Sequence, residues 1–106
     1  MLKVNRHPMP EQPADVRRHN FEEVALGYGE DTAVEEAQRC LNCPKPRCVA
    51  GCPVNIYIPK FIHAVAERDF ASAIRIIKEK SSLPAVCGRV CPQEKQCEGR
   101  CVLGIK

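Results

Sequence analysis

The sequence has little of what usually fills a protein core. Its 106 residues include no tryptophan, and aromatic side chains make up only 5% of the chain. A domain of this size buries a modest fraction of its surface and often depends on a covalent or metal staple. The length allows one domain, so the sequence predicts a small fold that needs more than its apolar side chains for stability.

Long apolar runs are also missing. The first thirty residues hold no basic start followed by an apolar stretch, so they do not resemble a secretory signal, and nothing in the chain is long enough to span a membrane. We therefore expect a cytoplasmic protein with no membrane partner. Thiols stay reduced in that compartment, where dense cysteine patterns indicate metal binding or catalysis before disulfides.

The charges do not indicate a nucleic-acid partner. Sixteen Lys and Arg residues against 13 Asp and Glu residues give a formal net charge of +3, and the two signs are interleaved along the chain. Proteins that bind nucleic acid usually combine a basic patch with stacking aromatic side chains. The two tyrosines and three phenylalanines are scattered here, so we expect no nucleic acid among the ligands.

What the chain has in abundance is cysteine. Eight cysteines fall into two groups, at residues 40–52 and 87–101. The first group reads CLNCPKPRCVAGCP, with the spacing C-x2-C-x4-C-x3-C-P, and the second has the spacing C-x3-C-P-x4-C-x3-C. Structural thiols alone do not explain this density, which indicates soft ligands for a metal centre.

Iron–sulfur clusters explain the spacing better than zinc or a redox dithiol. Structural zinc sites typically use two paired C-x2-C units, and only Cys40 and Cys43 form such a pair. A thioredoxin-like dithiol needs a βαβ context that is absent. Bacterial ferredoxins use a cysteine run that ends in Cys-Pro, as Cys52-Pro53 and Cys91-Pro92 do here. The pattern favours two [4Fe–4S] clusters, and a zinc-held structural or docking module is the alternative.

The rest of the sequence predicts helices and no sheet. Residues 58–80 carry apolar side chains at helical spacing on both sides of Asp69, a favoured N-cap residue, and so predict an αα-hairpin. Thr32 and Glu35 have capping-box spacing and predict a helix that leads to Cys40.

Further short helices are expected near the second cysteine group and near the N-terminus. One should start at Ser82-Leu83-Pro84 and carry Cys87 and Cys91, and another turn should span residues 97–101. Three prolines in residues 1–14 predict an extended arm. Residues 16–26 could form a short apolar face that lies across the body of the domain or across a partner.

Several residues near the cysteines have expected supporting roles. Backbone amides in VAGC and CGRVC are expected to donate to cluster sulfurs, with Gly51 and Gly88 permitting a close approach. Basic side chains that flank the ligands could offset cluster charge: Arg39, Lys45, Arg47, Arg89, Lys95 and Arg100. We expect His7, His19 and His63 to be surface or packing residues rather than ligands.

The cysteine groups and the hairpin between them resemble a known family. The segments CLNCPKPRCVAGCPV, FI…AVAERDFASAI and LPAVCGRVCPQEKQCEGRCVLG are similar to the N-terminal helical ferredoxin domain of the glutamate synthase small subunit. They are also similar to the corresponding domains of dihydropyrimidine dehydrogenase and of an NADH-dependent ferredoxin:NADP oxidoreductase. The resemblance covers about residues 15–106. It implies an all-α, small helical ferredoxin-like domain with two iron–sulfur cluster sites, preceded by the arm at residues 1–14.

The resemblance also implies a crossed set of ligands. Cluster 1 would be held by Cys40, Cys43, Cys48 and Cys101, and cluster 2 by Cys52, Cys91 and Cys97. Spacing alone leaves this open, because each of two i, i+4 pairs could equally share one metal: Cys48 with Cys52, and Cys97 with Cys101. In the family the fourth ligand of cluster 2 is a Gln or Glu beyond the position of Lys106. Cys87 is then either a packed non-ligand or a substitute ligand.

The function implied by the resemblance is electron transfer. The clusters would relay single electrons between a flavin and an acceptor, either a glutamate synthase large subunit or a ferredoxin-like protein. The sequence has no G-x-G-x-x-G dinucleotide loop. FAD and NADPH are therefore expected only in following domains of an NADPH-dependent oxidoreductase of the glutamate synthase type, and no catalytic residue is expected in these 106 residues.

Overall fold

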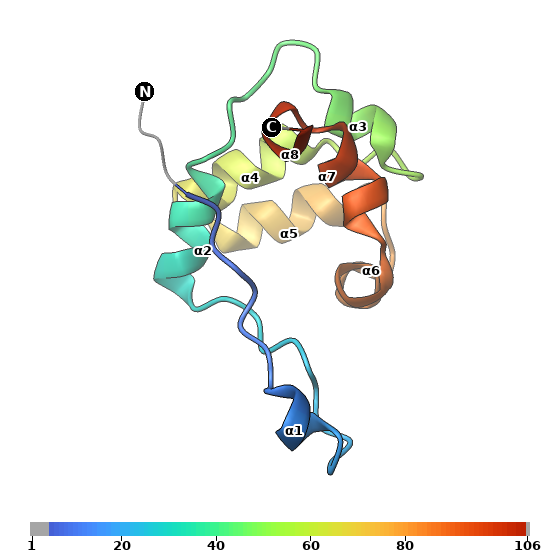
Figure 1. Ribbon diagram of the computed structural model, residues 1–106. Helices are drawn as coiled ribbons and strands as arrows, with labels where there is room; N and C mark the ends of the chain where they lie inside the picture. Colours follow the sequence, from blue (N-terminus) through green and yellow to red (C-terminus); the bar gives the residue numbers. More distant parts are fainter. Residues whose placement is uncertain (1–4, 106) are drawn as a thin grey trace.

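The computed structural model describes residues 5–105, and helices make up its regular structure (Figure 1). The α-helices are α1 (Ala14–Arg17), α2 (Glu30–Ala37), α3 (Arg47–Gly51), α4 (Ile58–Ala66), α5 (Phe70–Lys78), α6 (Pro84–Val90), α7 (Cys97–Arg100) and α8 (Val102–Ile105), with a 3-10 turn η1 (Gln93–Lys95). Within the described range the one β feature is an isolated bridge between Glu11 and Ala25. The all-α prediction is confirmed.

The α4–α5 hairpin is the centre of the fold, as the sequence predicted. Pro59 lies in the first turn of α4, and the Asp69 carboxylate caps α5 by accepting the Ser72 amide at 3.1 Å. α2 packs against α4. The apolar core between them is small, and its buried members are Val34, Ala37, Ala64 and Ala73.

The predicted capping box at the start of α2 is wrong. α2 begins at Glu30 with Gly29 as its N-cap and no side-chain capping bond, so Thr32 lies inside the helix. The earlier start is explained by Arg68, whose guanidinium pairs with Asp31 at 2.6 Å and with Glu30 at 3.3 Å. Acidic residues in a first helical turn also interact favourably with the helix dipole. α2 ends at Ala37, three residues before Cys40.

Residues 10–26 form an extension whose tip lies away from the helical body, while Glu23 on its returning segment pairs with Arg89 of α6 (Figure 1). Its base is closed by two backbone bonds, from the Gln12 amide to the Val24 carbonyl at 2.9 Å and from the Leu26 amide to the Pro10 carbonyl at 2.7 Å. Phe21 is fully exposed. The expected apolar face across the body is therefore wrong. The radius of gyration of 14.4 Å, against about 13 Å for a compact domain of this length, reflects the extension.

The two cysteine groups meet where α3 packs against α7. Gly51, the last residue of α3, permits this contact. A Cβ atom at Gly51 would lie 2.7 Å from the Gln96 carbonyl oxygen and 2.8 Å from Cγ of Arg100. A Cβ atom at Gly88 would have no protein atom from elsewhere in the chain within 4 Å, so this glycine is not needed for a close contact of that kind.

Candidate metal centre

Five of the eight cysteines lie at the ends of short helices. Cys48 and Cys97 belong to the first turns of α3 and α7, whereas Cys52, Cys91 and Cys101 directly follow α3, α6 and α7. All eight cysteines lie in the described part of the chain, carry free thiols and are partly exposed. The helix prediction at Pro84 is confirmed with one adjustment, because α6 contains Cys87 and ends just before Cys91.

Three thiols form what we term the first thiol set: Cys40, Cys48 and Cys101. Burial raises the pKa of the Cys48 thiol, and the nearby Cys101 and Cys40 thiols raise it further. Cys40 and Cys48 come from the first cysteine group, and Cys101 comes from the second. The first set therefore joins the two groups.

Four thiols form the second thiol set: Cys52, Cys87, Cys91 and Cys97. Desolvation raises the pKa of Cys91, and the Cys87, Cys52 and Cys97 thiols add to the rise. The pKa of Cys97 is raised by burial first and also by Cys52. One member of this set comes from the first cysteine group and three come from the second, so both sets draw on both groups. Burial first, and the neighbouring thiols second, favour the protonated form of Cys91 and Cys97 until a cation compensates the charge of their thiolates.

Backbone amides lie beside sulfur in each set. The Val49 amide lowers the pKa of the Cys48 thiol, and the Glu98 amide lowers the pKa of the Cys97 thiol, in both cases against the larger effect of burial. The Asn42 amide lies 3.5 Å from the Cys40 sulfur. Asn42 has a φ of 48°, a left-handed conformation that asparagine adopts more readily than most residues. These donors would stabilise negative charge on the ligating sulfurs.

Comparison with known proteins identifies the family to which this chain belongs. The family described as dihydropyrimidine dehydrogenase domain II, 4Fe-4S cluster, matches residues 17–106. The chain belongs to this family. It is 40% identical over 102 residues to the glutamate synthase [NADPH] small chain of Halomonas elongata and 37% identical over 102 residues to that of Escherichia coli. In both cases the match covers 96% of this chain and 22% of the relative.

A second type of relative carries the same domain. The NAD-dependent dihydropyrimidine dehydrogenase subunit PreT of Escherichia coli is 37% identical over 85 residues, which are 80% of this chain and 21% of the relative. The chain therefore spans about a fifth of the length of these curated relatives. It is an iron–sulfur domain of the kind found in glutamate synthase small chains and in dihydropyrimidine dehydrogenase subunits.

The thiols of this 4Fe-4S domain do not form a site for a single ion. Within residues 5–105, no three His, Cys, Asp or Glu side chains converge closely enough to hold one metal ion. A tetrahedral zinc ion needs four donors at about 2.0–2.3 Å from one point. A cubane presents four separate iron corners, so its thiolates need not converge. Eight free thiols are soft donors of the kind that iron–sulfur clusters use.

Cys43 and Cys87 have surroundings that differ from those of the other six cysteines. Cys43 lies in the segment between α2 and α3, and it is not among the thiols that raise the pKa of Cys48. Cys87 lies one helical turn before Cys91, and the Cys91 amide donates to the Cys87 carbonyl at 3.0 Å. The Cys87 sulfur is also 3.8 Å from the hydroxyl of Ser81, which is buried.

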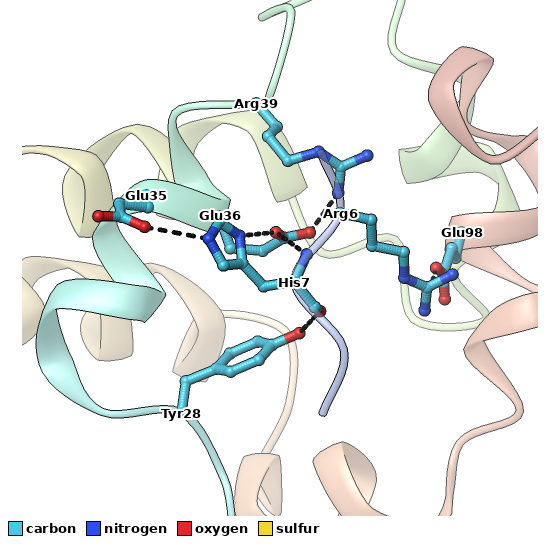
Figure 2. A network of polar contacts seen from close by, with 7 residues as sticks. All are labelled: Arg6, His7, Tyr28, Glu35, Glu36, Arg39 and Glu98. Atoms are coloured by element: carbon cyan, nitrogen blue, oxygen red, sulfur yellow. Dashed lines mark hydrogen bonds and ion pairs between the residues drawn. The ribbon is translucent and has the colours of Figure 1, made fainter. Parts of the chain in front are cut away.

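Two of the flanking basic residues already have acidic partners. Arg39 pairs with Glu36, and Arg89 pairs with Glu23. Arg39 belongs to a polar network centred on His7 that sequence reasoning missed (Figure 2). His7 and Glu36 are 29 residues apart, so no local spacing could have revealed their contact. His63 by contrast is an exposed residue paired with Glu67.

No helix in the described part of the chain is long and apolar enough to cross a membrane.

Proposed function

We propose that this domain binds two [4Fe–4S] clusters and relays single electrons between a flavin and an acceptor. Cluster 1 takes Cys40, Cys43, Cys48 and Cys101, and cluster 2 takes Cys52, Cys91 and Cys97. The observation that carries this proposal is the composition of the two thiol sets, each of which draws on both cysteine groups. Crossed ligation uses the first set with Cys43 added, and the second set with Cys87 as a candidate for its fourth position.

The chain's own residues supply the ligands and compensate their charge. A bound [4Fe–4S] cluster accepts and releases one electron at a time. The amides of Asn42, Val49 and Glu98 donate to ligating sulfurs, which favours the thiolate form and the more negative, reduced state of the cluster. Pro53 and Pro92 follow ligands and direct the chain away from the cluster without adding an amide donor.

The fourth position of cluster 2 has two candidate ligands. In the family it is a Gln or Glu from a segment beyond the position of Lys106. Within this chain Cys87 is the candidate, since it lies among Cys52, Cys91 and Cys97. The Cys87→Ala substitution distinguishes the two candidate ligands. Loss of one cluster identifies Cys87 as the ligand, whereas retention of both clusters means that a group other than Cys87 fills the fourth position.

The larger activity is inferred from the relatives. We infer that the domain serves an NADPH-dependent oxidoreductase of the glutamate synthase type, with FAD and NADPH bound by other domains and a large subunit or a ferredoxin-like protein as the acceptor. The similarity to two glutamate synthase [NADPH] small chains supports this. The similarity to PreT supports a dihydropyrimidine dehydrogenase as the alternative parent. A reducing compartment such as the cytoplasm would keep the eight thiols available for the clusters.

Anaerobic reconstitution tests the cofactor content. We expect about eight iron and eight acid-labile sulfide per chain, with electron paramagnetic resonance signals of two clusters after reduction. Stoichiometric zinc without sulfide would instead favour the zinc-held docking module. A colourless, iron-free product would contradict the proposal.

Double substitutions test the crossed ligation. Cys48→Ser with Cys101→Ser removes two proposed ligands of cluster 1 and should leave about four iron per chain, because cluster 2 remains. Cys48→Ser with Cys52→Ser removes one ligand from each cluster and should reduce both. If each cysteine group instead held its own cluster, the second pair would leave one cluster intact and the first pair would damage both.

A further inference from the structure

The N-terminal segment, residues 5–10, lies beside α2 and contacts α7; we call it the strap (Figure 2). The His7 amide donates to Glu36 Oε2 at 2.9 Å, and the His7 Nδ1 atom lies 2.8 Å from the same oxygen. The His7 Nε2 atom lies 3.0 Å from Glu35 Oε2. The Tyr28 hydroxyl donates to the His7 carbonyl at 2.6 Å. One residue of the strap is thus held by four polar contacts.

With both carboxyl groups ionised, this geometry requires a charged imidazole. A neutral histidine ring has one N–H donor and one nitrogen lone pair, and either tautomer would point that lone pair at a carboxylate oxygen. Only the imidazolium can donate from both nitrogens, to Glu36 and to Glu35. The hydrogen bond to Glu36, aided by Glu35, raises the pKa of His7 despite partial desolvation. Burial opposes ionisation of Glu36, but bonds from His7 and Arg39 outweigh it and lower the pKa of that carboxyl.

We propose that the strap is a protonation-dependent clasp, closed between α2 and α7 while His7 carries both ring protons and released when His7 loses one. The ionisable groups that face His7 and its partners are Glu35, Glu36 and Arg39 on α2, Tyr28 before α2, Arg6 on the strap and Glu98 on α7. Loss of one ring proton sets a lone pair against a carboxylate. If the remaining proton is on Nε2, the donors to Glu36 among the described residues are Arg39 and the His7 amide, and if it is on Nδ1, Glu35 loses its bond to the ring.

The contact with α7 depends on the same residue. Arg6 reaches Glu98 at 2.7 Å, but the Arg6 side chain is 66% exposed and that of Glu98 is 34% exposed. Exposed ion pairs contribute little on their own. His7 therefore decides whether the strap stays in place and keeps Arg6 within reach of Glu98.

The clasp connects segments that carry ligands of the proposed clusters, and this consequence depends on the proposed function. α2 leads to Cys40, and α7 begins at Cys97 and is followed by Cys101. A closed clasp thus connects α2, which precedes the first proposed ligand, Cys40, to α7, which begins at Cys97 and is followed by Cys101. Because the pKa of His7 is raised, the clasp is closed at and below the ordinary histidine pKa and opens as the pH rises through the raised value.

The protonation step can be measured without reference to the clusters. Hydrogen exchange at the imidazole C2 position, followed by mass spectrometry of the loaded protein across the pH range, gives a titration midpoint for each histidine. Tryptic peptides 7–17, 19–39 and 61–68 each contain one histidine. We expect the His7 midpoint to fall in Glu35→Gln, while those of His19 and His63 stay unchanged. An equal His7 midpoint in the two proteins would overturn the clasp.

Iron loss tests the consequence of opening. The loaded protein is mixed anaerobically with an iron chelator between pH 6 and 9, and His7→Gln is compared with the matched control His19→Gln, which removes an exposed histidine. In His7→Gln iron loss at low pH should be about two- to fivefold faster than in the control, the range that partly exposed ion pairs support. This difference should vanish at high pH, where the clasp is open in both. Equal rates at every pH would refute the clasp, whereas failure to load iron at all would refute the proposed function instead.

Discussion

Two glycines beside the cysteines allow opposite predictions from the same substitution. In Gly51→Ala the new methyl would meet the Gln96 carbonyl oxygen at 2.7 Å, a distance that Cβ atoms do not tolerate. The carbonyl is backbone, so α3 and α7 must separate. Overpacking of this kind costs about 1–3 kcal/mol. Gly51 ends α3, so the gain in helical propensity offsets little of that cost.

Gly88→Ala is the matched control. Gly88 lies inside α6, is exposed and has no protein atom within 4 Å of its Cβ position. Replacing a glycine in a helix with alanine stabilises by about 0.5–1 kcal/mol. The two substitutions therefore add one identical methyl group beside a cysteine with opposite expected signs.

Thermal melting of the loaded protein, followed by far-UV circular dichroism and by cluster absorbance, measures both effects. For a domain of this size about 1 kcal/mol corresponds to roughly 4–8 °C. We expect a fall of at least about 4 °C for Gly51→Ala and a small rise for Gly88→Ala. If both variants melted at the temperature of the unsubstituted protein, the α3–α7 contact would not be the junction that we describe.

Three further substitutions test local features. Asp69→Ala removes the acceptor of the Ser72 amide at the start of α5 and should lower the melting temperature. Asp69→Asn keeps a side-chain oxygen at the N-cap and should melt close to the unsubstituted protein. Asn55 has a φ of 54°, so Asn55→Ala should destabilise by about 1 kcal/mol and Asn55→Gly should be close to neutral in the same melts. Ser81→Ala removes the buried hydroxyl beside Cys87 and should increase the rate of Cys87 alkylation, measured by mass spectrometry.

The parts of the fold that depend on local interactions were predictable from the sequence. The α4–α5 hairpin follows from apolar spacing and from Asp69, whose carboxylate bonds an amide three residues later. The helix that starts at Pro84 follows from the preference of proline for a first helical turn. The eight cysteines indicated a soft-metal centre because their number and spacing are themselves local features.

The parts that depend on distant partners were not predictable. α2 starts two residues before Thr32 because Arg68, from the α4–α5 connection, pairs with Glu30 and Asp31. The strap depends on contacts of His7 with Glu35 and Glu36, which lie 28 and 29 positions further along the chain. Spacing could not assign the thiols to two sets either, since Cys48 and Cys52 are close in sequence yet have different thiol neighbours.

The small apolar core and the cysteine-rich region have different needs for stability. The buried apolar residues, Val34, Ala37, Ala64 and Ala73, all lie in α2, α4 and α5. Helices α3, α6 and α7, which carry or adjoin the thiols, contain none of them. That half is joined by the Gly51 contact, but its partly exposed thiols repel one another as they ionise. A bound cluster would remove the repulsion and supply the interior that this half lacks, so we expect metal binding there to contribute directly to folding.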